Sequence, residues 1–260
     1  ESFEKINNNK VDILFSILKT KKTYVKQINI SGNTRTFDYV IRRELDITEG
    51  DAINNSKIKQ IKKQLTQLPI FNNVDIKKIP NEDGSQNLDI TIEETQTGTF
   101  NVGLSVGTLD GVSFISGLKE RNINGTGRSL EFLINTSKDN KAFTLSTTEK
   151  FFLNNKVNHQ YSTQYKENDF SKSKSYKLNT FKLDTSFRYL FSEDLYHSFG
   201  IGYSLKDYIV TDSSTVSSNI ANSSGQNISF NFKNEITFDT LNSFIRPTKG
   251  NYISIANYLE

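Results

Sequence analysis

The side chains that usually carry out catalysis or hold metals are scarce in this chain. It has no cysteine, and its two histidines, His159 and His197, both fall within stretches where apolar and polar residues alternate. Asp184 and Asp239 lie near basic residues, but no serine–histidine–aspartate set and no pair of carboxylates has a spacing suited to nucleophilic or acid–base chemistry. We therefore expect no enzymatic activity, no cofactor and no metal site, with both histidines at structural positions in strands.

The charge balance argues against a nucleic-acid partner. The formal net charge is +3 with 23% charged residues, and the lysines and arginines form no clustered stripe.

Strands dominate the second part of the chain, where apolar and polar residues alternate. Successive side chains of a strand point to opposite faces, so each such segment has one apolar and one polar face. The alternation is clearest at 100–107, 181–191, 198–205 and 227–239, and weaker at 112–120, 128–137, 142–152, 157–168 and 251–259. We therefore predict nine antiparallel strands.

The composition of the two faces favours a membrane barrel over a soluble β-sandwich. The strands are long, and their apolar faces carry many aromatic residues, as barrel faces do near the bilayer interfaces. The opposite faces carry the charged residues Lys182, Asp184, Arg188, Lys233 and Glu235. A lysine or arginine facing lipid at mid-membrane would cost roughly 2–4 kcal/mol, so these charges suit a water-filled interior. Turns that are short or contain glycine alternate with two longer polar loops, at 167–175 and 211–225.

A compact β-α-α-β-β unit precedes these strands. We predict strands at 24–30, 71–79 and 87–94, a helix at 37–45, and a second helix in which Ile58, Ile61, Leu65 and Leu68 recur at helical spacing. Thr36 is expected to cap the first helix, Asn55 or Ser56 the second, and Pro69 ends it. Three strands with two helices on one face make a plausible small α+β domain.

The chain reads as an excerpt from a longer protein. It contains no methionine, and nine is an odd number where single-chain bacterial barrels have an even one. We expect residues 1–22, with a strand-like run at 11–17, to end a preceding domain, 23–95 to form the α+β unit, and 96–260 to form the first part of a barrel that does not close by itself.

The order and spacing of several short motifs give a family resemblance. In the α+β unit they are residues 24–33, 40–45, 49–51 and 68–74. In the strand region they are 97–105, 111–114, Asn124-Gly125-Thr126-Gly127, Phe238-Asp239-Thr240 and Arg246-Pro247-Thr248-Lys249-Gly250. With them the chain resembles the Omp85 family of outer-membrane proteins, and residues 23–95 resemble the POTRA domain next to the barrel. One departure is Glu149-Lys150-Phe151-Phe152, which lacks the proline that the family often has at this turn.

The resemblance implies a function, a location and partners. Members of the family that assemble other proteins insert and fold β-barrel proteins in the outer membrane of Gram-negative bacteria, with their POTRA domains in the periplasm. It implies unfolded outer-membrane proteins, periplasmic-side lipoproteins of the assembly complex and outer-membrane lipid as partners. The alternative is another family translocator, such as a two-partner secretion pore or a TamA-like assembly protein. A passive pore would not need the POTRA unit, and an enzyme barrel would need a nucleophile set.

The resemblance also places two candidate sites. The first is the opening barrel strand, where the family has its lateral gate for client strands: Thr99, Phe100, Asn101, Val102, Gly103, Leu104, Ser105, Val106 and Gly107. Gly103 and Gly107 would weaken packing there, or would simply relieve crowding or permit curvature. The edges of the POTRA strands would bind clients in the same way. The second site is Glu44, expected on the polar side of the first helix, which either contacts a partner lipoprotein or is a solvated helix charge.

Overall fold

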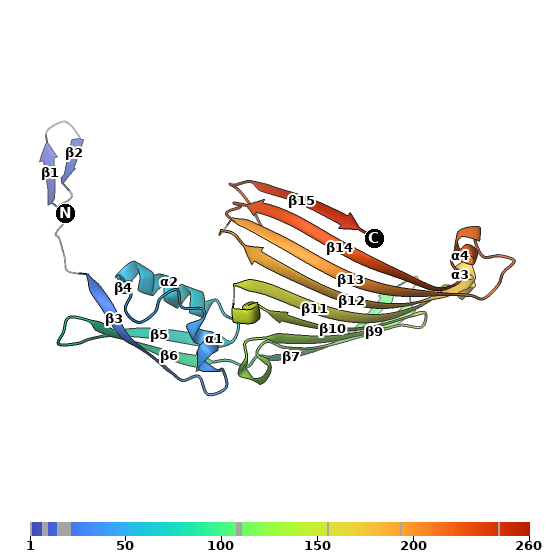
Figure 1. The fold of residues 1–260 in the computed structure, drawn as a ribbon, viewed down its shortest axis with the longest axis horizontal. Helices are drawn as coiled ribbons and strands as arrows, with labels where there is room; N and C mark the ends of the chain where they lie inside the picture. Colours follow the sequence, from blue (N-terminus) through green and yellow to red (C-terminus); the bar gives the residue numbers. More distant parts are fainter. Residues whose placement is uncertain are drawn as a thin grey trace.

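A computed structural model describes residues 2–6, 10–14, 22–107, 111–154, 156–192, 194–243 and 245–260. These residues form a hairpin of β1 (Ser2–Ile6) and β2 (Lys10–Leu14), a small α+β domain, and a nine-stranded sheet (Figure 1). The run predicted at 11–17 is a strand as far as Leu14, and residues 15–21 lie outside the described ranges. None of the helices in these ranges is both long enough and apolar enough to span a membrane.

The α+β domain has the predicted β-α-α-β-β order with one short strand added between the helices. Its elements are β3 (Thr23–Ser31), α1 (Asp38–Arg42), β4 (Ala52–Ile53), α2 (Asn55–Thr66), β5 (Phe71–Pro80) and β6 (Gln86–Glu94). The sheet order is β4-β3-β6-β5, with β3 parallel and β5 antiparallel to β6. The short β4 was not predicted. It pairs only with Thr23 and Tyr24 at the start of β3, and β5 forms the opposite edge of this sheet.

The core of this domain follows from the helical and strand periodicities. Val40 and Ile41 from α1 and Ile61 and Leu65 from α2 are almost completely buried. They pack against inward residues of the sheet: Val25, Ile28, Val74, Leu88, Ile90 and Ile92. Each fully buried aliphatic side chain contributes about 1.5–3 kcal/mol, so the domain has a core of its own.

Both predicted helix caps are wrong. Asn54 caps α2, because its Oδ1 accepts a hydrogen bond from the N–H of Lys57 at 2.8 Å. The residue before α1 is Phe37, with no side-chain cap, and Thr36 uses its hydroxyl elsewhere, as described below. The first helix is also shorter than the predicted 37–45, since Glu44 and Leu45 donate to the carbonyls three residues back and the chain tightens after Arg42.

The second sheet contains the nine predicted strands. They are β7 (Gly98–Gly107), β8 (Gly111–Glu120), β9 (Ser129–Thr136), β10 (Asn140–Glu149), β11 (Val157–Asp169), β12 (Tyr176–Leu190), β13 (Leu195–Val210), β14 (Gly225–Asp239) and β15 (Tyr252–Leu259). Each is antiparallel to its neighbour in sequence, and β7 and β15 lie at the two ends of the order. The sheet therefore confirms the alternation read from the sequence.

The register places apolar and polar residues in separate rows across the sheet. One row runs through the paired residues Phe100, Leu118, Phe132, Leu145, Thr163, Leu183, Tyr203 and Phe230. The adjacent row runs through Thr99, Lys119, Glu131, Ser146, Ser162, Asp184, Gly202 and Asn231. Because neighbouring residues of a strand point to opposite faces, one face of the sheet is apolar and the other is polar.

The connections segregate to the two ends of the sheet. Figure 1 shows α3 (Ser171–Lys174) and α4 (Ser218–Asn222) at the end far from the α+β domain. The turns that contain Ile123–Gly125 (η1) and Phe152–Asn154 (η2) lie at the near end. The loop predicted at 167–175 is shorter than expected, because β11 continues to Asp169.

Candidate functional site: the edge strand β7 and its joint with the α+β domain

The predicted gate residues 99–107 lie in β7, at the edge of the nine-stranded sheet. Within this chain β7 pairs with β8 on one side, in an unbroken register from Gly98 opposite Glu120 to Gly107 opposite Gly111. The backbone groups on the other side of the strand point away from the sheet. A strand edge of this kind can accept a further strand by backbone hydrogen bonding.

The side chains of β7 alternate as predicted. Phe100, Val102, Leu104 and Val106 share the apolar face, and their exposed fractions range from 58% to 82%. No other part of the described chain covers these side chains, so this face suits contact with lipid. Among the described residues, a Cβ added to Gly103 would have nothing within 4 Å.

A buried hydrogen bond joins the base of this sheet to the α+β domain. The side-chain amide of Asn122 donates to the hydroxyl of Thr36 at 2.8 Å, and the N–H of Phe37 donates to the carbonyl of Gly125 at 2.9 Å. The Asn122 carboxamide oxygen in turn accepts from the N–H of Gly127 at 2.7 Å. The turn after β8 is therefore built around the segment that leads into α1.

The two glycines of the turn are required by close approach. Gly125 has φ +74°, and an added Cβ would lie 2.1 Å from the carbonyl oxygen of Arg35. Gly127 has φ +71°, and an added Cβ would lie 2.7 Å from Cγ1 of Val40. These contacts give a physical role to the Asn124–Gly127 motif on which the family resemblance partly rests.

Arg43 makes the other main contact of the joint. Its guanidinium lies 4.8 Å from the ring centre of Phe151, which belongs to the turn after β10, and 5.6 Å from that of Tyr39. It also donates through Nη2 to the carbonyl of Thr126 at 3.3 Å. A cation between two aromatic rings, with partial desolvation, adds of the order of 1 kcal/mol to such a contact.

The structure corrects the placement of Glu44. The residue lies in the turn after α1, and its half-buried side chain lines a cavity of about 290 Å³ between the domain and the polar face of the sheet. Lys119, Arg121 and Lys150 line the same cavity from the sheet. Burial raises the pKa of Glu44, and the nearby Lys150, Arg43 and Lys156 partly offset this rise. The interpretation as a freely solvated helix charge is therefore wrong.

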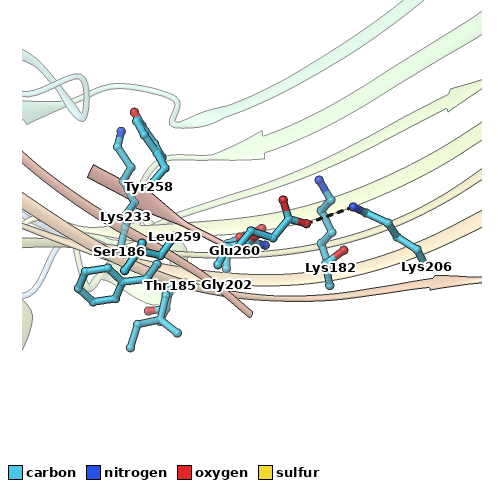
Figure 2. A pocket seen from close by; sticks show the side chains of 15 residues that line it. Lys182, Thr185, Ser186, Gly202, Lys206, Lys233, Tyr258, Leu259 and Glu260 are labelled. Atoms are coloured by element: carbon cyan, nitrogen blue, oxygen red, sulfur yellow. Dashed lines mark hydrogen bonds and ion pairs between the residues drawn. The ribbon is translucent and has the colours of Figure 1, made fainter. Parts of the chain in front are cut away.

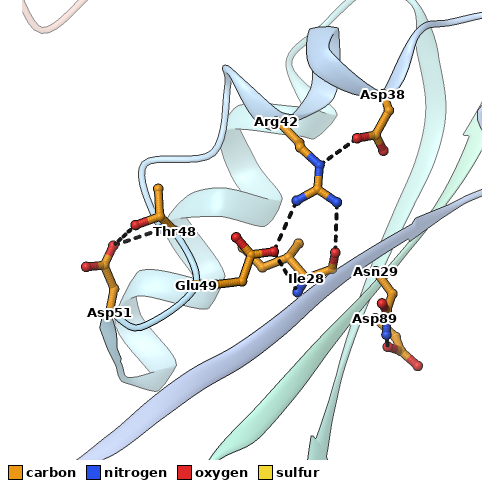
Figure 3. Close-up of polar contacts among 8 residues, drawn as sticks. All are labelled: Ile28, Asn29, Asp38, Arg42, Thr48, Glu49, Asp51 and Asp89. Carbon is orange, nitrogen blue, oxygen red and sulfur yellow. Dashed lines mark hydrogen bonds and ion pairs between the residues drawn. The ribbon is translucent and has the colours of Figure 1, made fainter.

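Sequence reasoning missed a polar cluster around Arg42. Figure 3 shows its guanidinium between Asp38 and Glu49, with Nη1 3.3 Å from Glu49 Oε1 and Nη2 donating to the carbonyl of Ile28 at 2.9 Å. The Glu49 carboxylate also accepts from the N–H of Ile28 at 3.2 Å. The hydrogen bond from its own N–H, then that of Ile28, lowers the pKa of Glu49, and Arg42 adds to this. The spacing of Asp38 and Arg42, four residues apart on a helix, was the available signal.

The polar face of the sheet carries a wide depression of about 660 Å³ between β12, β13, β14 and β15. Figure 2 shows lysines from three strands around it: Lys182, Lys206 and Lys233. Lys206 lies 3.3 Å from Glu260, and Lys233 lies 2.8 Å from Glu235. Gly202 forms part of the floor, and an added Cβ there would lie 2.5 Å from Asp184 Oδ1.

The histidines have partners within the strands. His159 in β11 lies 2.9 Å from the hydroxyl of Thr185 and stacks on Phe187 with ring centres 4.6 Å apart. His197 in β13 lies 2.6 Å from Oδ1 of Asn234. Among the residues that the structure describes, no three histidine, cysteine or acidic side chains are grouped to hold a metal.

Comparison with known families decides the assignment. A model of the Omp85 superfamily domain matches residues 122–259, and a POTRA model, described as the surface antigen variable number repeat, matches residues 23–95. The chain belongs to the Omp85 superfamily. The resemblance inferred from the motifs is thereby confirmed.

Individual relatives of this Omp85 chain carry the name outer membrane protein assembly factor BamA. One from Neorickettsia risticii is 27% identical over 255 residues, which cover 96% of this chain and 34% of the relative. One from Neisseria meningitidis serogroup B is 31% identical over 176 residues, which cover 65% of this chain and 22% of the relative. The chain thus spans roughly a fifth to a third of the length of these curated relatives.

Solved structures agree with the Omp85 assignment. BamA from Haemophilus ducreyi lacking POTRA domains 1–3 matches with a TM-score of 0.74 at 25% identity, over 96% of this chain and 49% of that one. CdiB from Acinetobacter baumannii matches with a TM-score of 0.58 at 13% identity, over 91% of this chain and 46% of that one. At this identity the match shows a shared fold alone. The α+β POTRA-like domain followed by a nine-stranded antiparallel sheet is the predicted fold.

Proposed function

We propose that this chain is the part of an outer-membrane protein assembly factor that receives unfolded β-barrel proteins and templates their strands. The observation that carries the proposal is the strand β7, which lies directly after a POTRA-like domain and is the first strand of the nine-stranded sheet, paired within this chain with β8. The name of the curated relatives supports it.

The templating step follows from the backbone chemistry of an edge in lipid. Unpaired N–H and C=O groups in the bilayer core are costly, so an edge there seeks a partner strand. In the longer protein, a closing strand that pairs only weakly with β7 would leave this partner exchangeable. A client strand would then form hydrogen bonds with residues 99–107 and bury both edges at once.

The POTRA-like domain offers a second edge of the same kind. β5 is its outer strand, and Ile79 near its end is 44% exposed. Lys77 and Lys78 on the same strand are also exposed, and charged residues on an edge discourage uncontrolled pairing. A client in extended conformation would add to β5 and then pass to β7.

Location and partners follow from the same proposal. Residues 1–22 would end a preceding POTRA domain, 23–95 would form the POTRA domain in the periplasm, and 96–260 would form the first part of a barrel in the outer membrane. Outer-membrane lipid would contact the apolar face of the sheet. Glu44 remains the candidate contact for a periplasmic lipoprotein, which would have to reach the joint between the domain and the sheet.

The alternative is another translocator of the Omp85 superfamily, such as a secretion pore or a TamA-like protein. The structural likeness to CdiB concerns the fold alone and does not favour this alternative. We therefore propose the assembly factor as the function.

Disulfide crosslinking in the full-length protein tests the proposal. The chain has no cysteine of its own, so single cysteines can be placed along residues 99–107 and on the terminal strand of a folding client. We expect crosslinks in one register, and none from the control Thr163→Cys, which lies on the interior strand β11. Efficient assembly without any crosslink along β7 would move the client site to the POTRA domain or the lumen and overturn the gate assignment.

A further inference from the structure

Side-chain contacts support the two ends of β7 differently. We call the end at residues 96–101 the root of the strand and the end at residues 102–107 its tip. At the root, the Arg121 side chain donates through Nη1 to the hydroxyl of Thr99 at 2.8 Å and to the carbonyl of Thr97 at 3.2 Å. The N–H of Arg121 donates to the same carbonyl at 3.2 Å. Arg121, one residue beyond the end of β8, is therefore hydrogen-bonded both to Thr99 near the start of β7 and to Thr97 just before the strand. We call these contacts of Arg121 the clasp.

The root is also continuous with the joint. Arg121 precedes Asn122, whose side chain bonds to Thr36 of the α+β domain. Thr97 is buried, with 9% exposure. The position of the first residues of β7 is thus tied through one short segment to the domain beneath the sheet.

The tip of β7 has no comparable support. Among the described residues, no side-chain hydrogen bond or ion pair involves 100–107 of β7 or the facing 111–118 of β8. The pairing of β8 with β9 begins only at Phe114, opposite Thr136. The tip of the β7–β8 hairpin therefore projects beyond β9 as a two-stranded ribbon, which is marginally stable by itself.

We propose that Arg121 is a positioning residue that fixes the root of the templating strand, so that β7 loosens from its Gly107 end while Thr99 stays in place. This inference rests on the proposed function for its consequence: the fixed root sets the register in which a client strand pairs. A compliant tip lets the edge adapt to clients of different twist. The clasp itself is a property of this chain and stands whether or not a client binds.

Hydrogen exchange in the full-length protein in lipid nanodiscs, without client, tests the clasp alone. In the unsubstituted protein we expect peptides covering 96–101 to exchange more slowly than those covering 102–107. Arg121→Ala should speed exchange at the root by about tenfold or more, the factor for one hydrogen bond to a charged group, and leave the tip unchanged. Arg121→Lys should restore part of the protection, because an ammonium keeps the positive charge and can still donate a hydrogen bond, but it lacks the planar fork of donors of the guanidinium.

Arg128→Ala is the matched control. It removes a cation from the same end of the sheet, where Arg128 pairs with Glu149 at 3.0 Å, and it should leave exchange in β7 unchanged. Equal exchange at root and tip before substitution, or no change at the root after Arg121→Ala, would overturn the clasp.

Client crosslinking then tests the consequence separately. With Arg121→Ala we expect crosslinks from cysteines in residues 99–107 to spread over neighbouring registers, while Arg128→Ala keeps the single register. A single register retained after Arg121→Ala, with faster exchange at the root, would refute the register role but keep the clasp. Absence of crosslinks in the unsubstituted protein would instead contradict the proposed templating function.

Discussion

The side-chain amide of Asn122 donates a hydrogen bond to the hydroxyl of Thr36 across 86 positions of sequence, and both residues are buried. This bond joins the α+β domain to the sheet at the base of the candidate gate. Buried polar groups lose more when one partner is removed than the bond itself contributes, so each partner depends on the other.

The first prediction concerns this bond. Asn122→Ala should lower the free energy of unfolding of the joint by about 1–3 kcal/mol, because it removes the donor to the Thr36 hydroxyl and leaves the N–H of Gly127 without a partner. The double variant with Asn122→Ala and Thr36→Val should lose less free energy of unfolding than the sum of the losses of the two single variants. Proteolysis of the joint at increasing urea measures the effect, with the exposed Asn227→Ala as control. Strict additivity would show that the two side chains do not act as a pair.

The second prediction separates backbone conformation from close approach. Gly84 and Gly125 both have positive φ, but an added Cβ meets nothing at Gly84 and a carbonyl oxygen at 2.1 Å at Gly125. Gly84→Ala should therefore lower the free energy of unfolding by about 1–2 kcal/mol. Gly125→Ala should lower it considerably more and reduce the amount of folded protein visibly. The amount of protein that resists unfolding in detergent at room temperature gives the comparison. Similar amounts for both variants would mean that the turn can move away from Arg35.

The third prediction is a pH dependence at Glu94. Burial alone would raise the pKa of this carboxyl, but hydrogen bonds from Thr36, Arg35 and Thr34 outweigh it and hold the pKa at about 2. A lowered pKa stabilises the folded domain above the unfolded value near 4.5. This stability is lost as the pH falls through 4.5 toward 2.

Glu94→Gln should accordingly destabilise the domain at pH 7, by roughly 2–3 kcal/mol, and much less at pH 3. The midpoint of urea unfolding of residues 23–95, read by pulse proteolysis in the full-length protein, is the measurement. The neighbouring Glu93→Gln is the control, since Glu93 accepts only an exposed hydrogen bond from Asn72. An equal loss at both pH values would mean that the charge of Glu94 is not what stabilises the turn.

The fourth prediction tests Glu44 as a partner contact. Because burial raises its pKa, the charged form is disfavoured, and Glu44→Gln should not lower the stability of the joint at pH 7. If a periplasmic lipoprotein recognises the carboxylate, the same variant should lose most of its co-purification with that lipoprotein. If a stable Glu44→Gln protein co-purifies with the lipoprotein as well as the unsubstituted protein does, Glu44 is not a contact for that lipoprotein.

The fifth prediction tests which face of the sheet meets lipid. Leu145 and Ser146 are neighbours on β10 and point to the apolar and polar faces. Leu145→Lys should destabilise the barrel by up to about 2–4 kcal/mol, and Ser146→Lys should be tolerated in a water-filled lumen. Urea unfolding in lipid vesicles compares the two. The opposite order would mean that the apolar face is turned inward.

The strands of this protein could be predicted because their signal is local. The face on which a residue such as Leu183 lies can be predicted from its immediate neighbours Lys182 and Asp184 alone, because apolar and polar residues alternate in a strand. The α+β domain was predictable for the same reason, since Ile61 and Leu65 repeat at the helical period within one element.

The joint could not be predicted, because its partners are distant in sequence. Thr36 has the residue type of a helix cap, but α1 begins one residue later than predicted, with Phe37 at the cap position, and the Thr36 hydroxyl accepts a hydrogen bond from Asn122 instead. Glu44 was misplaced by extending the period of α1 beyond Arg42, where the chain tightens to carry Arg43 against Phe151. Both errors arise where tertiary contact overrides a local preference.

The turn formed by residues 122–127 has a practical meaning for anyone who exchanges modules between members of this superfamily. It is encoded with the strands, yet its glycines and its asparagine are fitted to Arg35, Thr36 and Val40 of the preceding domain. A chimera that cuts the chain at the linker near residue 96 would separate this turn from the surface that it matches. A graft that transfers residues 23–128 together would keep the two halves of the fitting in register.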